Sequence, residues 1–398
     1  AKIWLRIRHC LVATIKIFNS IFNKKHYSTQ QENINTDILF VSHLTNKIQT
    51  LQGNDAYFGD LPSQLLEQGI NSGIALINHA KVSNKNISSG WKGNRVYRFV
   101  LSPSLDFLSE IELYFAQRKS KKELRFILED LKIGRELTRC VLRHHLSSST
   151  LSSLRIAKQV ADIINQTGAK FVITTYEGHA WERLVYYYAR KINPNIKCFG
   201  YQHAAIFECQ HAIKRPLSAE YNPDIILTSG LIAKDILEQE QLKESEITCI
   251  GSPKYSIPCA MTNKRQACLV VPAYIVEECL NLFKFSLIYA KKHQDQKFIW
   301  RLHPLINFER LKKYSSIFKE LPSNICLSES SLKKDIKDCD SVLYHASTAV
   351  VNAINSGLRP IYYRQSSDEL SIDPIYQHQQ GKEIVHNQKE LNLALNKA

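Results

Sequence analysis

The amino-acid sequence predicts an α/β fold with two doubly wound parallel sheets. Short apolar segments of strand length alternate with helical segments along most of the chain, and the alternation pauses near residues 258–264 before it starts again. Several apolar segments end on polar residues, which places hydrogen-bonding groups at the carboxyl edge of each predicted sheet. Open α/β folds bind ligands at that edge, so the sequence predicts ligand-binding groups in both halves of the chain.

The length and amino-acid composition are those of a globular protein with a strong positive charge. The 398 residues are enough for two or three domains, and 44% hydrophobic with 22% charged residues is an ordinary composition for a soluble chain. The 52 Lys and Arg against 37 Asp and Glu give a net charge of +15, which implies anionic partners: nucleic acid, an anionic lipid surface, or substrates with phosphate or carboxylate groups. The ten cysteines form no C-x-x-C pair, so we expect reduced thiols in a cytoplasmic protein.

Residues 1–36 are predicted to form a basic amphipathic helix and a linker. The apolar residues that recur at helical spacing between Lys and Arg are Trp4, Leu11, Ile15, Phe18 and Phe22. Such a helix can lie on an anionic membrane through residues 1–26, or it can pack on the core of the protein itself. No segment reaches the ~18 apolar residues that span a bilayer. The membrane alternative is therefore a peripheral position on the inner face of the cytoplasmic membrane.

Residues 37–257 are expected to form a first Rossmann-like domain. A strand-free region at about 108–150 interrupts the alternation of strands and helices, and we interpret it as a helical insertion with a solvated basic face. The expected strands are 37–42, 73–78, 96–102, 170–175, 197–203, 224–229 and 247–251.

Residues 265–398 are expected to form a second Rossmann-like domain after a short linker. Its expected strands are 268–272, 297–303, 324–328, 341–345, 359–363 and 383–386. Two such domains with parallel sheets facing each other make a cleft, and clefts of this kind are common ligand sites.

A carboxylate follows the strand expected at 170–175. Gly178 permits a tight turn into the next helix, so Glu177 projects at the carboxyl edge of the sheet. There a carboxylate can act as a general base toward a hydroxyl group or as a nucleophile toward an anomeric carbon. The alternative is a helix N-cap, for which Glu is only a moderate choice. We interpret Glu177 as a catalytic residue.

The next predicted strand also ends on a polar residue at the carboxyl edge of the sheet. His203 closes this strand and can bind substrate or orient Glu177, although a histidine at a strand end is about as often a structural hydrogen-bonding group. Tyr201 in the same strand, and Tyr57 and Asp60 near the first strand, are candidates for the same side of the cleft.

In the second domain, polar residues also lie at the carboxyl ends of two predicted strands. Arg301 and His303 end an apolar strand and Pro304 fixes the following turn, so both side chains can donate to a phosphate oxygen or a nucleotide carbonyl. Ser347 and Thr348 precede a small-residue helix, where backbone N–H groups and hydroxyls can hold a phosphate. A plain N-cap is the alternative for Ser347 alone. Together the residues at these two strand ends indicate a nucleotide-binding site.

These motifs resemble those of GT-B glycosyltransferases, and within them the bacterial sialyltransferase, polysialyltransferase and Kdo-transferase groups that use CMP-activated sugars. Those groups carry an acidic-Gly motif in the N-terminal domain, a His-Pro motif in the C-terminal domain and a Ser/Thr motif after it. Here Glu177-Gly178, His303-Pro304 and Ser347-Thr348 occur in that order. The resemblance implies an acceptor domain at 37–257 and a nucleotide-sugar donor domain at 265–398.

By this resemblance Glu177 is the catalytic carboxylate, His303 binds the CMP moiety, and Ser347 with Thr348 holds its phosphate. It also implies a glycan or glycolipid acceptor, and no cofactor beyond the CMP-sugar that serves as donor substrate. No Asp-x-Asp metal motif stands in the expected Rossmann loop, which agrees with metal-independent chemistry in which a helix terminus and His or Ser donors stabilise the leaving phosphate.

The sequence departs from these groups at Tyr176, where some members carry a second acid. Residues 339–363 also resemble CDP-glycerol glycerophosphotransferases, which use a cytidine nucleotide but transfer a different group. The expected reaction is transfer of a sialic-acid-like or Kdo-like 3-deoxy-ulosonic acid to a glycan of the capsule, O-antigen or lipooligosaccharide. It inverts if Glu177 deprotonates the acceptor and retains if Glu177 forms a glycosyl adduct.

A nucleic-acid-binding protein is the alternative of a different class. The net charge of +15 favours it, but the sequence has no nucleic-acid recognition motif and no interleaving of aromatic and basic residues. We therefore expect no nucleic-acid partner.

Overall fold

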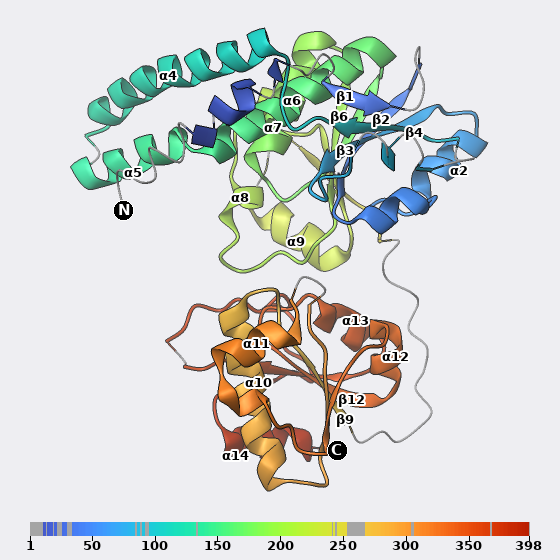
Figure 1. Cartoon of the computed structure of the whole chain (residues 1–398), viewed down its shortest axis with the longest axis vertical. Helices are drawn as coiled ribbons and strands as arrows, with labels where there is room; N and C mark the ends of the chain where they lie inside the picture. Colours follow the sequence, from blue (N-terminus) through green and yellow to red (C-terminus); the bar gives the residue numbers. More distant parts are fainter. Residues whose placement is uncertain are drawn as a thin grey trace. The chain divides into compact units, whose positions relative to one another are not determined.

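The computed structural model shows two compact units (Figure 1). The first comprises Ala1–His203 and His211–Lys254, and the second comprises Ala204–Gln210 and Tyr255–Ala398. The described residues are 11–397 apart from 13, 19, 22–25, 30–33, 84–85, 88–89, 92–94, 133, 241, 243–244, 253–266, 304–305 and 367. Each unit is built around one sheet.

The first unit contains an eight-stranded sheet. Its strands are β1 (Tyr27–Thr29), β2 (Ile38–Leu44), β3 (Ser72–Asn78), β4 (Tyr97–Leu101), β5 (Phe171–Thr175), β6 (Lys197–Gln202), β7 (Ile225–Thr228) and β8 (Glu246–Cys249). They lie in the order β1-β4-β3-β2-β5-β6-β7-β8, and all pairs are parallel except β1 with β4. The chain therefore changes direction across the sheet between β2 and β5. Such a switch point is where open sheets bind ligands.

Strand β1 lies where the sequence predicts the start of a polar linker. It pairs antiparallel with β4, and the ring of Tyr27 meets that of Phe99 edge-on at 5.4 Å between centroids. A three-residue edge strand carries no readable alternation of apolar and polar residues. The linker prediction is wrong for these residues because pairing with β4, a distant segment, decides their conformation.

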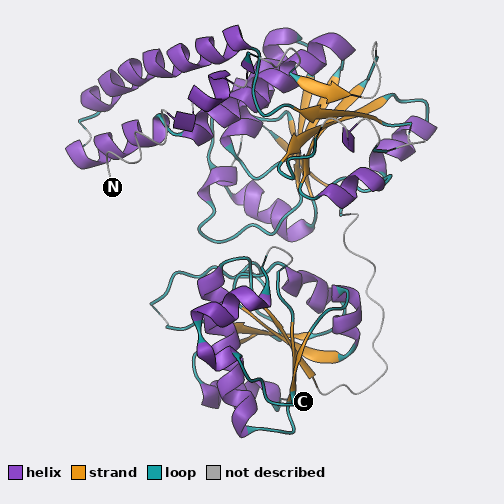
Figure 2. Cartoon of the chain, in the orientation of Figure 1, coloured by secondary structure: helices purple, strands orange, loops and turns teal. Residues whose placement is uncertain are grey.

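Helices pack around this sheet (Figure 2). They are α2 (Leu61–Glu67), α4 (Phe107–Asp130), α5 (Arg135–His145), α6 (Ser148–Thr167), α7 (Ala180–Ile192), α8 (His211–Lys214) and α9 (Leu231–Gln239), with the 3-10 helices η1 (Lys47–Leu51) and η2 (Ala219–Tyr221). The strand-free region predicted at about 108–150 is helical, as expected. Helix α4 begins after Asp106, whose side chain accepts a hydrogen bond from the backbone of Ser109, and α6 ends at Gly168 with φ of +70°.

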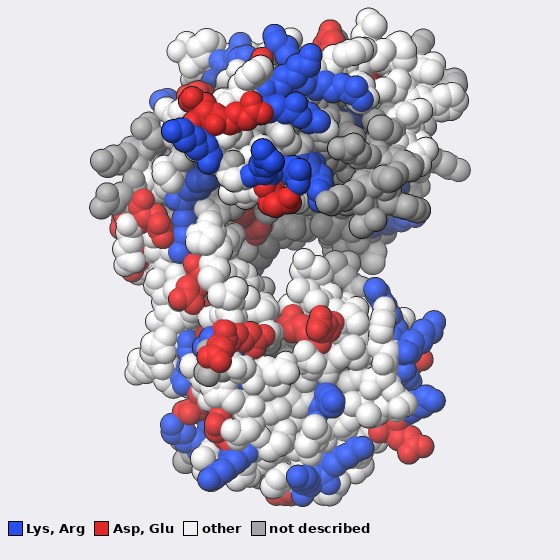
Figure 3. Space-filling model, turned by 90° about the vertical axis from the view of Figure 1, so that its left-hand side faces the viewer, with Lys and Arg blue, Asp and Glu red and all other residues white. Residues whose placement is uncertain are grey.

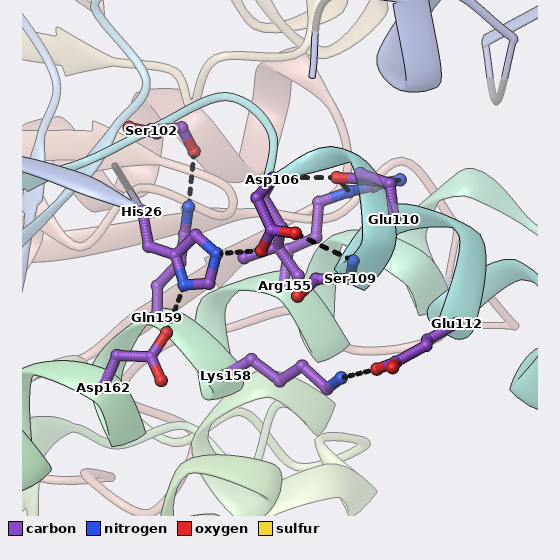
Figure 4. Close-up of polar contacts among 11 residues, drawn as sticks. His26, Ser102, Asp106, Ser109, Glu110, Glu112, Arg155, Lys158, Gln159 and Asp162 are labelled. Atoms are coloured by element: carbon purple, nitrogen blue, oxygen red, sulfur yellow. Dashed lines mark hydrogen bonds and ion pairs between the residues drawn. The ribbon is translucent and has the colours of Figure 1, made fainter. Parts of the chain in front are cut away.

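Ion pairs connect α4 to α6 and to the segment before β1 (Figure 4). Arg155 of α6 donates to both carboxylate oxygens of Glu110 of α4, at 2.6 and 2.7 Å, and both side chains are buried. His26 lies between Asp162 and Asp106, and hydrogen bonds with these carboxylates, Asp162 first, raise the pKa of the imidazole. Removing one partner of a buried ion pair typically costs about 3–5 kcal/mol. The pairs therefore hold the helical region firmly on the sheet domain.

The second unit contains a six-stranded, fully parallel sheet. Its strands are β9 (Ala267–Val271), β10 (Lys297–Trp300), β11 (Ile325–Leu327), β12 (Cys339–Tyr344), β13 (Arg359–Tyr363) and β14 (Glu383–Val385). Their order is β11-β10-β9-β12-β13-β14, so the switch point lies between β9 and β12. The helices are α10 (Val276–Lys292), α11 (Phe308–Tyr314), α12 (Leu332–Lys337), α13 (Ala349–Asn355) and α14 (Gln388–Leu395), with η3 (Ser316–Phe318).

The core of the second unit covers both faces of its central strands. All five residues of β9 are buried, as expected for a parallel strand between two helical layers. Trp300, at the end of β10, is fully buried and stacks on Phe283 of α10 with 4.3 Å between ring centroids. All thirteen strands expected from the sequence are present, each end within three residues of its expected position. The predicted α/β class with two parallel sheets of GT-B type is confirmed.

The predicted N-terminal helix is described only in part, and Trp4 and Phe22 lie outside the described residues. The described helical residues are 11–12, 14–18 and 20. Lys16 donates from Nζ to the carbonyl oxygen of Pro103 at 2.5 Å, and Ser20 is buried, so the helix contacts the protein. Its exposed apolar side chains are Leu11, Ile15, Phe18 and Ile21. Within the described part of the chain, no helix combines the length and apolar character needed to cross a membrane.

Candidate functional site

Titratable side chains gather at the carboxyl edge of the first sheet, at its switch point. His43 lies near the end of β2, and its Nε2 atom is 3.1 Å from Oγ1 of Thr175 at the end of β5. The Nδ1 atom of the same ring is 3.0 Å from Nε2 of His79, which directly follows β3. A chain of hydrogen bonds therefore runs along this edge from Thr175 through His43 to His79.

Gly178 fixes the turn that carries Glu177. Its φ angle is +80°, in the left-handed region that side chains other than hydrogen avoid. A Cβ atom here would lie 2.3 Å from the carbonyl carbon and oxygen of Ala212 in α8. Only glycine fits, and the tight strand-to-helix turn predicted from the sequence is confirmed.

Two imidazoles hold the carboxylate of Glu177. Its Oε2 atom is 3.0 Å from Nε2 of His179, and its Oε1 atom is 3.8 Å from Nδ1 of His203. The hydrogen bond with His179 is the main cause that lowers the pKa of Glu177; burial opposes it, and His203 adds to the lowering. The same hydrogen bond raises the pKa of His179. Glu177 is therefore ionised at neutral pH, and His179 binds a proton more readily than a free histidine does.

A second, buried carboxyl group supports the same turn. Glu182 of α7 accepts hydrogen bonds from the backbone N–H groups of Glu177, at 3.1 Å, and of His179, at 2.7 Å. The residue is 1% exposed, and burial raises its pKa to about 8. Because Glu182 binds the backbone on both sides of Gly178, the protein itself sets the shape of the turn.

His43 is neutral at physiological pH. Burial is the main cause that lowers the pKa of its imidazole to about 3, and His79 and His203 act in the same direction. A neutral imidazole donates through one nitrogen and accepts through the other, so His43 can pass a proton between Thr175 and His79. His79 is exposed, so this path reaches the solvent.

Aromatic rings complete the site. Tyr57 stacks on His203 with 4.8 Å between ring centroids, and Trp181 meets His43 edge-on at 5.5 Å. Burial raises the pKa of Tyr57, and the nearby Glu177 carboxylate adds to this effect. Flat apolar rings beside an ionised carboxylate give the surface both an apolar platform and a polar group that fixes orientation.

The structure brings together three of the site residues that were predicted from the sequence for the first unit, namely Tyr57, Glu177 and His203. Tyr201 is buried in β6 with its ring centroid 6.3 Å from that of His203, so it supports the histidine from inside the sheet. Asp60 is exposed at the start of α2. The roles of these residues toward an acceptor stay predictions.

Sequence reasoning missed His43, His79, His179 and Trp181. His43 and His79 end or follow predicted strands, so the strand-end rule that selects His203 would have selected them as well. Their convergence, however, depends on strand order. Strand β2 lies between β3 and β5, and only this order places His43 beside both His79 and Thr175.

In the second unit, Arg301 follows β10 but is already engaged within the fold. Its Nη1 group donates to Asp335 at 2.8 Å and to the carbonyl oxygen of Ser330 at 2.6 Å. Asp335 also accepts from the hydroxyl of Ser328 at 2.6 Å. Arg301 therefore connects β10 to the loop between β11 and α12, and its role toward a nucleotide stays a prediction.

His303 lies half-buried two residues further on. Its ring centroid is 5.9 Å from that of Tyr274. Burial lowers the pKa of His303, and Glu278 opposes this shift, so the imidazole is neutral at neutral pH and its N–H group can donate. Pro304 lies outside the described residues.

Ser347 and Thr348 lie between the end of β12 and the start of α13, at the switch point of the second sheet. Ser347 is buried, whereas Thr348 is exposed and occupies the N-cap position. The strand-to-helix junction expected from the sequence is confirmed, but its role in holding a phosphate stays a prediction. In the part of the chain that the structure describes, no group of three or more His, Cys, Asp or Glu side chains is placed to hold a metal ion.

No protein-family model matches the chain, and no curated protein matches its sequence. Solved structures do match its fold. UDP-GlcNAc 2-epimerase from Methanocaldococcus jannaschii is 13% identical, the match covers 90% of this chain and 93% of the epimerase, and the TM-score is 0.51. UDP-N-acetylglucosamine 2-epimerase from Rickettsia bellii is 12% identical over 91% of this chain and 87% of the epimerase, with a TM-score of 0.50. At such identities the likeness shows the fold alone, over nearly the whole chain.

Proposed function

We propose that the chain is a glycosyltransferase that moves a 3-deoxy-ulosonic acid from a CMP donor to a cell-surface glycan. The observation that carries this proposal is the ionised Glu177 carboxylate, held by His179 and His203 at the switch point of the first sheet. The obligatory Gly178 turn and the buried Glu182 hold the backbone beside it. A carboxylate that is fixed in this way can accept the proton of an acceptor hydroxyl.

In the proposed reaction, the acceptor oxygen attacks the anomeric carbon while the bond from that carbon to the phosphate oxygen breaks. The acceptor proton passes to Glu177, and CMP leaves with the bonding electron pair. The low pKa of Glu177 makes it a weak base by itself, but His179, whose pKa is raised, can take the proton onward. The exposed His179 then returns the proton to the solvent.

The leaving phosphate needs hydrogen-bond donors, which the second unit can supply. We propose that the neutral imidazole of His303 and the hydroxyls of Ser347 and Thr348 donate to it. No metal ion and no further cofactor enters this proposal.

A thermal-shift series with CMP, CDP, UMP, UDP, GDP and UDP-GlcNAc tests the donor class. A ligand that binds only the folded state raises the melting temperature, so we expect the largest shifts from CMP or CDP. If UDP-GlcNAc gives the larger shift in melting temperature and the protein converts it to an epimer, the result would favour a 2-epimerase activity instead. A shift from CDP-glycerol with transfer of glycerol phosphate would support the other cytidine-nucleotide reaction.

We also propose that the N-terminal helix docks on an anionic membrane, where a glycolipid acceptor would lie. Leu11, Ile15 and Phe18 follow helical spacing and are 55%, 55% and 61% exposed. Figure 3 shows Lys and Arg side chains gathered on one side of the first unit, with fewer Asp and Glu side chains among them. Apolar insertion together with basic charge is the combination that binds anionic lipid surfaces.

A further inference from the structure

Helix α4 carries a row of exposed side chains on the face that points away from the fold. Together with α5 it extends beyond the sheet of the first unit (Figure 1). Its buried residues are Glu110, Leu113, Gln117 and Leu128. Because a helix turns by about 100° per residue, the exposed row lies roughly opposite these residues. We call this row the α4 stripe, and its members are Leu108, Glu112, Phe115, Lys119, Lys122 and Phe126.

The large apolar residues of the α4 stripe lie on one line. Leu108, Phe115 and Phe126 are 70%, 63% and 70% exposed. Single exposed apolar residues are common on protein surfaces, but these three follow one side of a helix over about 27 Å. An apolar row of this length indicates contact with another surface.

The spacing of the α4 stripe is that of a coiled coil. Its six positions are separated by four, three, four, three and four residues, which is the a/d repeat of a heptad. A seam with this repeat packs against a second helix. All six residues are exposed, so no helix within the described part of this chain covers the seam.

The order of residues in the α4 stripe matches a second copy of the same helix. If two α4 helices lie antiparallel about a two-fold axis beside residue 117, the two members of each matched pair are equally far from that axis. The pairs are Leu108 with Phe126, Glu112 with Lys122, and Phe115 with Lys119. The first pair is apolar, the second is an ion pair, and the third places an ammonium group beside an aromatic ring. The two-fold axis makes each pair occur twice.

We infer that two copies of this chain bind each other through the α4 stripe, with their α4 helices antiparallel. A parallel pair in register would place Glu112, Lys119 and Lys122 each against the same residue of the other copy, and these like charges repel. Glu112 also contacts Lys158 of α6 at 3.7 Å, but its side chain is 72% exposed and can accept a second lysine. One helix from each copy buries less than about 1,200 Å², the range of transient complexes, so the dimer is reversible.

Sedimentation of the full chain without lipid, over a range of protein concentrations, tests this inference. We expect the wild type to pass from monomer to dimer as its concentration rises. Lys122→Glu and Glu112→Lys should each weaken the dimer about tenfold, because each places like charges opposite each other twice. Both effects are expected although the two substitutions change the net charge in opposite directions. The double variant exchanges the charges within each pair, so it should dimerise like the wild type.

Lys284→Glu is the matched control. Lys284 is exposed in the middle of α10 in the second unit, so the same charge change there should leave the dimer unchanged. The melting temperature of each variant shows whether its fold is intact. If the double variant stays as weak as the single variants, the antiparallel pairing is wrong. A wild type that is monomeric at every concentration would overturn the inference.

A lipid surface is the other occupant that this test can reveal. Phe115→Ser together with Phe126→Ser should make the chain monomeric and leave its binding to anionic liposomes intact. If this variant instead loses liposome binding while the wild type is monomeric, the α4 stripe binds lipid and the dimer is refuted.

Discussion

The two switch points of this protein share one strand order and carry opposite chemistry. In the first sheet β2 lies between β3 and β5, and in the second sheet β9 lies between β10 and β12. In both sheets the chain adds strands on one side of the first parallel strand and then crosses to its other side. At the first switch point, His43 contacts Thr175 across the strands, and three imidazoles, those of His43, His179 and His203, act on the carboxylate of Glu177. At the second, Glu278 bridges the loops through backbone N–H groups, and two carboxylates flank the single imidazole of His345.

Strand order therefore places each candidate site at a switch point, whereas the side chains at the strand ends set the charge of that site. The imidazole of His179, whose pKa is raised, suits a site that moves protons. Carboxylates with buried oxygens suit hydrogen-bond donors. Each prediction below changes one unit and leaves the other as a reference.

The largest effect is expected for Glu177→Gln. The amide cannot accept the acceptor proton, so turnover should fall ~100-fold or more. CMP affinity should stay unchanged, because the proposed nucleotide contacts are all in the second unit. Initial rates and a CMP titration on the same preparation measure both, with Glu136→Gln on α5 as the control. If the variant keeps more than a tenth of wild-type turnover, His203 or another group carries the reaction.

Gly178→Ala should destabilise the first unit by about 3 kcal/mol, because the positive φ and a clash with the α8 backbone act together. Gly69→Ala is the matched control. Its φ is +82° with no atom within 4 Å of the added Cβ, so it should lose only about 1 kcal/mol from strain. Urea unfolding measures both variants, and equal losses would show that the close approach of α8 contributes nothing.

Glu182→Gln tests the buried carboxyl group through pH. Burial raises its folded pKa from 4.5 to about 8, so between these values the folded protein binds more protons than the unfolded chain. This group's contribution to the free energy of unfolding therefore falls as pH rises through this window, by up to about 1.4 kcal/mol per pH unit. The amide variant lacks this dependence and should gain stability relative to the wild type from pH 5 to pH 9. Denaturation curves at pH 5, 7 and 9 measure this gain. If the free energies of unfolding of the variant and the wild type differ by the same amount at all three pH values, the raised pKa of Glu182 is refuted.

His303→Ala should weaken CMP binding about tenfold, the value of one good hydrogen bond to a charged phosphate. The chemistry at Glu177 is unchanged, so the loss should appear in KM more than in kcat. Calorimetry gives the affinity, and His378→Ala, elsewhere in the same unit, is the control. Unchanged affinity would remove His303 from the nucleotide site.

The smallest effect is expected at the N-terminal helix. The double substitution of Ile15→Ser and Phe18→Ser removes two exposed apolar side chains but keeps the contacts of Lys16 and His26. We expect severalfold weaker co-sedimentation with anionic liposomes at low salt and an unchanged melting temperature. A matched pair on α4, Phe115→Ser and Phe126→Ser, controls for loss of exposed apolar area. Unchanged liposome binding would end the membrane proposal.

The sequence alone was enough for thirteen of the strands, for the glycine turn and for part of one candidate site. Buried parallel strands are continuous apolar runs, and polar residues directly after them must lie at the carboxyl edge, so Glu177 and His203 could be predicted by local rules. Gly178 could be predicted because a strand that turns sharply into a helix needs a residue with positive φ.

Tertiary structure decided the rest. Strand order brings His43 to His79 and Thr175, and long-range packing turns Arg301 toward Asp335 and buries Glu278 between two loops. β1 exists only because β4 offers it an edge. These contacts join residues that are far apart in the sequence, and no local period or motif records them. The sequence therefore determined which chemical groups stand at the strand ends, and the fold determined which of them meet.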